Sequence, residues 1–184
     1  SSAKGVSGIV SCNNCSSGKY GIKSGATSSE SGCKSCPEGW FQNVLGKIIC
    51  RECSAGQHSA SQGSIACIDC SPGKYAATLK ASTKCSLCGD DEYQNASKAT
   101  SCIKVDRGFY RSGPTTQVEC SPGKYGLGGE NDCVPCDIGE FQNEPKKTSC
   151  KKCPKGWTNS IGASTACNEC APGNYAATEG SKNC

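Results

Sequence analysis

The sequence predicts a small disulfide-rich fold, an elongated rod of ten units of about 17 residues with little or no helix. Nineteen of the 184 residues are cysteine, a proportion typical of disulfide scaffolds from oxidising compartments. Cys-x-x-Cys pairs recur at nearly constant intervals, which indicates a linear array. No window of 11 or more residues has a helical apolar period, so each unit is expected to be a turn and a short strand.

The disulfide pairing follows from a place where the pattern fails. We call the second cysteine of each pair the opening cysteine of a unit, and the first cysteine of the next pair its closing cysteine. Val105 stands in an opening position and Gln117 in the following closing position. Two neighbouring losses are explained if these positions are partners. Each opening cysteine is therefore predicted to bond the closing cysteine of its unit, which restrains the unfolded chain by roughly 3 kcal/mol.

This rule predicts nine bridges and leaves Cys12 over, either unpaired or bonded to another chain. The predicted bridges are Cys15–Cys33, Cys36–Cys50, Cys53–Cys67, Cys70–Cys85, Cys88–Cys102, Cys120–Cys133, Cys136–Cys150, Cys153–Cys167 and Cys170–Cys184.

Three other interpretations of the pairs compete with this one. Zinc ribbons use similar pairs, but zinc sites require longer or varied gaps, and the losses at 105 and 117 would then spoil two sites. Redox catalysis lacks the β-α-β pattern that accompanies such pairs. A second disulfide scheme closes each pair on itself, joins Cys102 to Cys120 and leaves Cys184 over.

Each unit carries a turn signal after its opening position. Glycine follows by three residues in all units but one, where Asp91 stands, and an aromatic ring follows by five except at His58 and Thr158. Motifs such as Ser-Pro-Gly-Lys set a tight turn, because proline fixes φ and glycine supplies a positive φ. The rings are expected to cover disulfides.

The units also form a longer repeat of about 50 residues, seen in the recurrence of WFQN, EYQN and EFQN. We expect an N-terminal segment at 1–11, a single unit at 12–32, and three-unit blocks at 33–84, 85–132 and 133–184. The block at 85–132 lacks one bridge.

No catalytic, cofactor-binding or metal site is predicted, and the chain is not expected to be an enzyme. His58 is the single histidine, so it supports no nucleophile–base pair, and in its unit it replaces a ring. Paired carboxylates, a phosphate loop and a calcium loop do not stand out.

Three surface features are candidates for interaction. Asn95-Ala96-Ser97 is an N-glycosylation sequon. The basic cluster is either a solvated face or a contact for an acidic glycan; it comprises Lys146, Lys147, Lys151, Lys152 and Lys155. The segment that lost its bridge is either a tolerated loss or a freer interface; it contains Arg107, Phe109, Tyr110 and Arg111, residue types common at binding hot spots.

Composition also limits compartment and partners. The cysteine content favours an extracellular or cell-surface location. No apolar run approaches a membrane span, and 1–10 has no signal-peptide pattern. The net charge of +4 is too small and dispersed to argue for nucleic acid.

Two extracellular families have similar sequence patterns. CIDCSPGKY and CNECAPGNY resemble the ephrin-receptor-like cysteine-rich repeats. The single bridge after a Pro-x-Gly-x-Tyr turn resembles the first module of tumour necrosis factor receptor repeats, without their second, interlaced module. The resemblance covers Cys12 to Cys184 and implies an extracellular repeat architecture, which occurs in receptors, adhesion proteins and matrix proteins.

Two functions are consistent with these observations. The first is a structural role as a segment or subunit of a secreted or surface filament, which self-associates head to tail. The second is a stalk or ligand-binding ectodomain of a cell-surface receptor, whose partners are other extracellular proteins or glycans.

Overall fold

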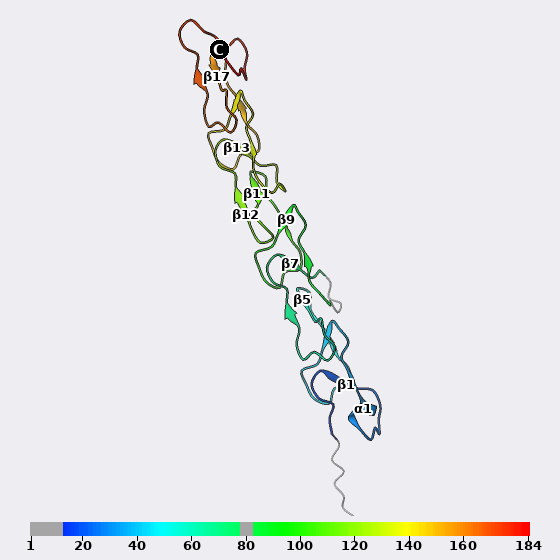
Figure 1. Ribbon diagram of the computed structural model, residues 1–184. Helices are drawn as coiled ribbons and strands as arrows, with labels where there is room; N and C mark the ends of the chain where they lie inside the picture. The colour runs from blue at the N-terminus through cyan, green and yellow to red at the C-terminus, as the bar shows by residue number, and fades with distance from the viewer. Residues whose placement is uncertain (1–12, 78–82) are drawn as a thin grey trace, which may run out of the picture. The chain divides into compact units, whose positions relative to one another are not determined.

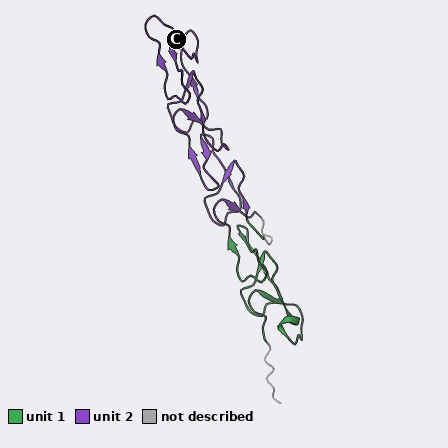
Figure 2. Ribbon diagram, in the orientation of Figure 1, with its two compact units in different colours: residues 1–69, 78–85 green, residues 70–77, 86–184 purple. Residues whose placement is uncertain are grey.

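The chain forms two compact units, each a single file of short repeats (Figures 1 and 2). The computed structural model describes residues 13–77 and 83–184. Of these, 13–69 and 83–85 belong to the first unit, and 70–77 and 86–184 belong to the second. The N-terminal segment 1–11 and Cys12 lie outside the described residues.

Each hairpin of the structure joins two strands of two or three residues in antiparallel register. The pairs of the first unit are β1 (Lys19–Gly21) with β2 (Cys33–Ser35), β3 (Trp40–Phe41) with β4 (Arg51–Glu52), and β5 (Gln57–His58) with β6 (Ile68–Asp69). Those of the second unit are β7 (Lys74–Tyr75) with β8 (Ser86–Leu87), β9 (Glu92–Tyr93) with β10 (Ile103–Lys104), β11 (Phe109–Arg111) with β12 (Gln117–Glu119), β13 (Lys124–Tyr125) with β14 (Val134–Pro135), β15 (Glu140–Phe141) with β16 (Lys151–Lys152), and β17 (Trp157–Thr158) with β18 (Asn168–Glu169).

A single helical turn, α1 (Ser29–Gly32), is the only helix among the described residues. Ser28 caps it: the Ser28 side chain accepts from the Ser31 amide, and the Ser31 hydroxyl lies near the Ser28 backbone N–H. A four-residue helix held by a capping box shows no apolar period, so sequence periodicity does not reveal it.

The disulfides run from each opening cysteine to the closing cysteine of the same unit, across 13 to 18 residues. The structure contains Cys15–Cys33, Cys36–Cys50, Cys53–Cys67, Cys88–Cys102, Cys120–Cys133, Cys136–Cys150, Cys153–Cys167 and Cys170–Cys184. Cys70 and Cys85 are also disulfide-bonded. Small disulfide-rich repeats with almost no helix, the fold class predicted from the sequence, are confirmed.

The glycine of each turn has the backbone conformation that the motif predicts. From Gly18 to Gly173, all nine have φ between 78° and 89°. No space is left for a side chain at Gly123 either, because a Cβ atom there would overlap the carbonyl oxygen of Ala163. The turn therefore requires glycine both for its φ and for close approach of the chain.

Successive repeats are joined by main-chain hydrogen bonds that recur at equivalent positions. In the repeat that opens at Cys120, Gly123 N donates to Gln142 O at 2.7 Å, and Lys146 N donates to Cys120 O at 2.9 Å. The next repeat has the same bonds from Gly139 to Asn159 and from Ala163 to Cys136, both 2.8 Å long. We call this set the backbone clasp. Because it uses only main-chain atoms, it tolerates different side chains from one repeat to the next.

The interior consists mainly of opening cysteines and of residues that follow a ring; the rings themselves are half-buried, except Tyr175, which is exposed. Gln142 is 2% exposed, and its side chain is hydrogen-bonded at both ends. Its Nε2 donates to Ser149 O at 2.8 Å, and its Oε1 accepts from Glu144 N at 3.2 Å. Gln42 and Gln94 make the same two bonds in their own loops. The recurring Gln-Asn motif therefore marks a buried, fully bonded side chain.

Hydrogen bonds hold the repeat in which Val105 and Gln117 take the places of the bridged cysteines. Val105 is buried in the opening position, and its N–H still donates to Asp91 O at 2.9 Å, as opening cysteines do to the preceding turn glycine. Gln117 accepts from Asp106 N and donates to the Asp106 carboxylate, both at 2.8 Å. The hairpin β11–β12 pairs three residues on each strand. The segment that lost its bridge is thus held by hydrogen bonds of the Gln117 side-chain amide.

Candidate interaction surfaces

The basic cluster is centred on the hairpin β15–β16, whose two faces carry different residues. Phe141 pairs with Lys151 across the strands, and Glu140 pairs with Lys152. Since side chains alternate between the faces of a strand, Phe141 and Lys151 share one face and Glu140 and Lys152 share the other. The Lys151 ammonium lies 5.9 Å from the centroid of the Phe141 ring.

Three of the five lysines of the basic cluster form ion pairs with acidic side chains. Lys147 Nζ lies 2.7 Å from Glu144, and Lys151 Nζ lies 3.8 Å from the same carboxylate. Lys146 Nζ lies 2.9 Å from Glu119. The hydrogen bond from Lys147, together with the charges of Lys147 and Lys151, holds the pKa of Glu144 below its usual range. Lys152 and Lys155 are exposed and have no ion-pair partner in the part of the chain that the structure describes.

An apolar groove of about 330 Å³ lies beside Lys151. Phe141 and Asn143 come from one repeat, and Pro154, Trp157 and Thr165 come from the next. Trp157 is 38% exposed. The Lys151 ammonium donates to the Asn143 side-chain oxygen at 3.2 Å, which places a cation at the groove rim. Sequence reasoning missed this groove, because residues 141 and 157 meet only when consecutive hairpins stack.

A second groove, of about 490 Å³, lies at the opposite face of the same hairpin. Its lining mixes acidic side chains, including Asp137 and Glu179, with Lys152 and Lys182. Charges of both signs lie side by side there, so this groove favours no simple charged ligand.

The predicted interface residues fall on β11 and the turn before it. Arg107 is exposed, whereas Phe109, Tyr110 and Arg111 are half-buried. Arg111 Nε donates to Glu92 O at 2.8 Å. The Lys146 ammonium lies 5.5 Å from the centroid of the Phe109 ring. Two of the four residues thus make contacts with neighbouring repeats, and the interface remains a prediction.

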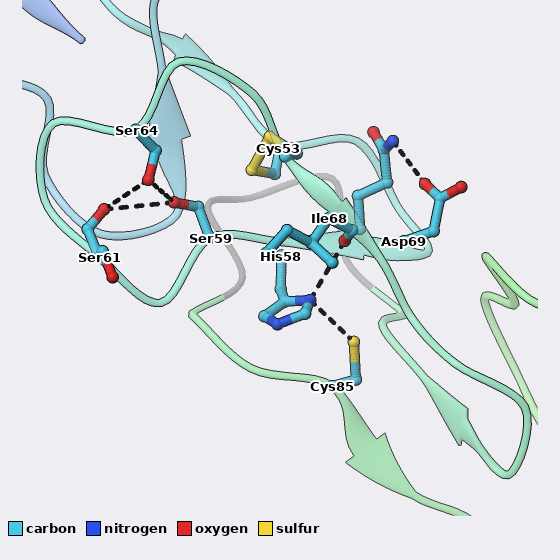
Figure 3. The surroundings of a disulfide bond; sticks show 10 residues. Cys53, His58, Ser59, Ser61, Ser64, Ile68, Asp69 and Cys85 are labelled. Atoms are coloured by element: carbon cyan, nitrogen blue, oxygen red, sulfur yellow. Dashed lines mark hydrogen bonds between the residues drawn. A yellow bond between two sulfur atoms is a disulfide. The ribbon is translucent and has the colours of Figure 1, made fainter.

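His58 lies against a disulfide sulfur (Figure 3). Its Nδ1 is 3.2 Å from Ile68 O and 3.3 Å from Cys85 Sγ. A carbonyl oxygen and a disulfide-bonded sulfur both only accept, so Nδ1 carries the proton in this arrangement. In the same repeat, Ser59 takes the position of the buried glutamine and donates to Ser64 Oγ at 2.6 Å.

The remaining sequence predictions concern modification and membrane contact. Asn95 and Ser97 are exposed, and glycosylation of Asn95 stays a prediction. Among the described residues, no helix is long and apolar enough to cross a bilayer.

The comparison with known families bears on the repeats themselves. Residues 29–70 and 123–166 match the family described as tyrosine-protein kinase ephrin type A/B receptor-like. These two segments are similar to ephrin-receptor-like cysteine-rich repeats. No curated protein matches the sequence. The match and the disulfides together indicate an extracellular type of repeat domain.

Proposed function

We propose that this chain is a non-enzymatic structural segment of an extracellular filament or scaffold. The observation that carries the proposal is the backbone clasp, repeated from one repeat to the next by equivalent main-chain atoms. Main-chain hydrogen bonds of this kind fix neighbouring repeats without involving their side chains. The array is therefore stiffened locally, while its surface residues can differ from one repeat to the next. In the absence of a large apolar core, disulfides hold the repeats closed, except where Gln117 bonds Asp106 instead.

Assembly is proposed to proceed by contacts between like chains. Exposed apolar side chains are spread along the repeats, with Ile48 74% and Ile161 66% exposed. A head-to-tail contact between unlike surfaces extends without closing and gives a fibre. Cys12 is proposed to strengthen such a contact by an intermolecular disulfide.

Electron microscopy of native material tests the proposal, together with gels run with and without reductant. We expect filaments or sheets, and ladder species that collapse to one band on reduction. Separate rods, a single non-reduced band and a titratable thiol at Cys12 would refute it. Substituting Cys12 by serine is the matched variant: it should remove the covalent ladder and leave the disulfides within the chain intact.

A second candidate function is ligand recognition by a receptor ectodomain. The exposed Arg107, three residues before the half-buried Tyr110, favours it, because arginine and tyrosine are enriched in binding hot spots. The double substitution R107A/Y110A should abolish binding to such a partner and leave filaments unaffected. Unchanged binding of native extracellular proteins by this variant would remove the candidate.

A further inference from the structure

We propose that the block 133–184 binds an anionic polysaccharide, with sugar rings on Phe141 and Trp157 and with sulfate or carboxylate groups on the surrounding lysines. The inference does not depend on filament formation, since the groove and the lysines belong to two consecutive repeats of one chain. A failed binding test therefore leaves the structural proposal standing, and absence of filaments leaves this one standing.

The distribution of charge is the first argument. Segment 144–155 contains five lysines and one acidic residue, so its net charge of +4 equals that of the whole chain. The equivalent segments of the two preceding blocks, 44–55 and 96–107, carry +1 and +2. The basic surface is thus specific to one block rather than a property of the repeat. A local cluster of this density attracts polyanions.

The lysines on the groove side are the second argument. Lys155 adjoins the groove lining in sequence and has no ion-pair partner among the described residues, whereas Lys147 and Lys151 share Glu144. An incoming sulfate or carboxylate needs to displace no acidic group at Lys155, but Glu144 competes with it for Lys147 and Lys151 and so limits the affinity. Lys152 lies on the opposite face of the hairpin and takes no part.

The aromatic groove is the third argument, and it distinguishes a sugar from other anions. The faces of the Phe141 and Trp157 rings are negative and attract the C–H groups of a sugar ring. Asn143 and Thr165 offer hydrogen-bonding groups at the same groove, and Lys151 lies at its rim. The groove volume of about 330 Å³ is at the lower end of ligand clefts. This combination fits one or two residues of a charged polysaccharide.

The first block supplies an internal comparison. Ser54 and Gln57 stand there at the positions of Pro154 and Trp157. Gln57 Nε2 donates to Asp69 at 2.7 Å, across the pair that corresponds to Trp157 and Glu169. The substitutions P154S and W157Q therefore recreate side chains that the same fold already accommodates, and glutamine at 157 gains a partner in Glu169.

Binding to immobilised heparin, measured at several salt concentrations, is the first experiment. K151Q/K155Q should weaken binding at least tenfold and reduce its salt dependence. K23Q/K34Q removes two exposed lysines from the first unit and is the matched control, expected to change affinity less than twofold. E144Q should strengthen binding about threefold, because it releases Lys147 and Lys151. Equal effects of the two double variants would overturn the proposed location.

The second experiment tests the sugar contact. W157Q should weaken heparin binding about tenfold with an unchanged salt slope, whereas Y175Q, which alters another exposed ring, should have no effect. Polygalacturonate, which carries carboxylates alone, separates uronate from sulfate recognition. Neutral dextran should not bind. Unchanged binding by W157Q, or equal binding of polyphosphate, would contradict a saccharide site and leave only a polyanion-attracting surface.

Both experiments require proof that the variants fold. Non-reducing peptide maps should show the Cys136–Cys150 and Cys153–Cys167 bridges in every variant. Loss of binding with these bridges intact supports the site. Loss of binding by all variants alike, including Y175Q and K23Q/K34Q, would overturn it.

Discussion

Buried amide side chains hold the loops of this chain, either within one loop or between two consecutive repeats. Gln142 connects Ser149 O to Glu144 N, and Asn159 connects Glu140 O to Ile161 N. Both residues are almost fully buried. A buried amide is stable only when both of its ends are bonded, which explains why the motif keeps Gln or Asn rather than an apolar residue.

Replacing Gln142 by leucine should destabilise its repeat by about 2 kcal/mol. The new side chain has a similar size but removes the partners of Ser149 O and Glu144 N in a partly buried loop. Amide hydrogen exchange of residues 142–150 would measure the loss. T148A, an exposed change in the same loop, should stay within about 0.5 kcal/mol. Equal protection in Q142L and the parent chain would refute the role of the glutamine.

Gly123 and Ala163 give a second test at single positions, because they approach one another and both have positive φ. G123A should cost about 3 kcal/mol or more, since its Cβ would meet Ala163 O. A163G should change stability by less than about 1 kcal/mol, because glycine suits its φ of 56° but loses more chain entropy. Thermal unfolding of both variants decides; a neutral G123A would contradict the close approach.

The hairpin β11–β12 shows, at the level of one element, what substitutes for a disulfide. Gln117 bonds Asp106 twice, and Val105 keeps the main-chain bond of an opening cysteine. The element keeps its register without the covalent link. The turn and strand residues of β11–β12 are therefore sufficient to form the hairpin without a disulfide.

Restoring the bridge with V105C/Q117C should stabilise this hairpin by about 2 kcal/mol. Closing the loop contributes roughly 3 kcal/mol, and the lost Gln117–Asp106 bonds offset part of it. Amide exchange in β11–β12 should slow about tenfold or more in the oxidised variant. V105C alone, which has no partner, is the control. Failure of the two thiols to bond in air would contradict the partnership of positions 105 and 117.

The pairing of opening with closing cysteines and the turn glycines could be predicted from sequence, because both recur at fixed spacings. The buried glutamines could not, since a polar residue next to a ring is typical of an exposed strand. The groove at Phe141 and Trp157 could not either, because stacking of two repeats brings these residues together. The one signal for the glutamines was the recurrence of Gln-Asn in each block.

Across the described part of the molecule, disulfides and hydrogen bonds that close single repeats take the place of a continuous apolar core. The buried residues of each unit are mainly cysteines, small residues and bonded amides, whereas many large apolar side chains are exposed. Stability is therefore expected to divide among repeats and their clasps rather than to reside in one cooperative core. The disulfide connectivity is the property on which every other conclusion depends.

Tryptic peptides mapped without reduction test that connectivity most directly, because Arg51 separates Cys50 from Cys53. Peptide 48–51, which contains Cys50, should be found joined to peptide 35–47, which contains Cys36. Peptide 48–51 joined instead to 52–74 through Cys53, or recovered with a free or metal-bound thiolate, would contradict the account.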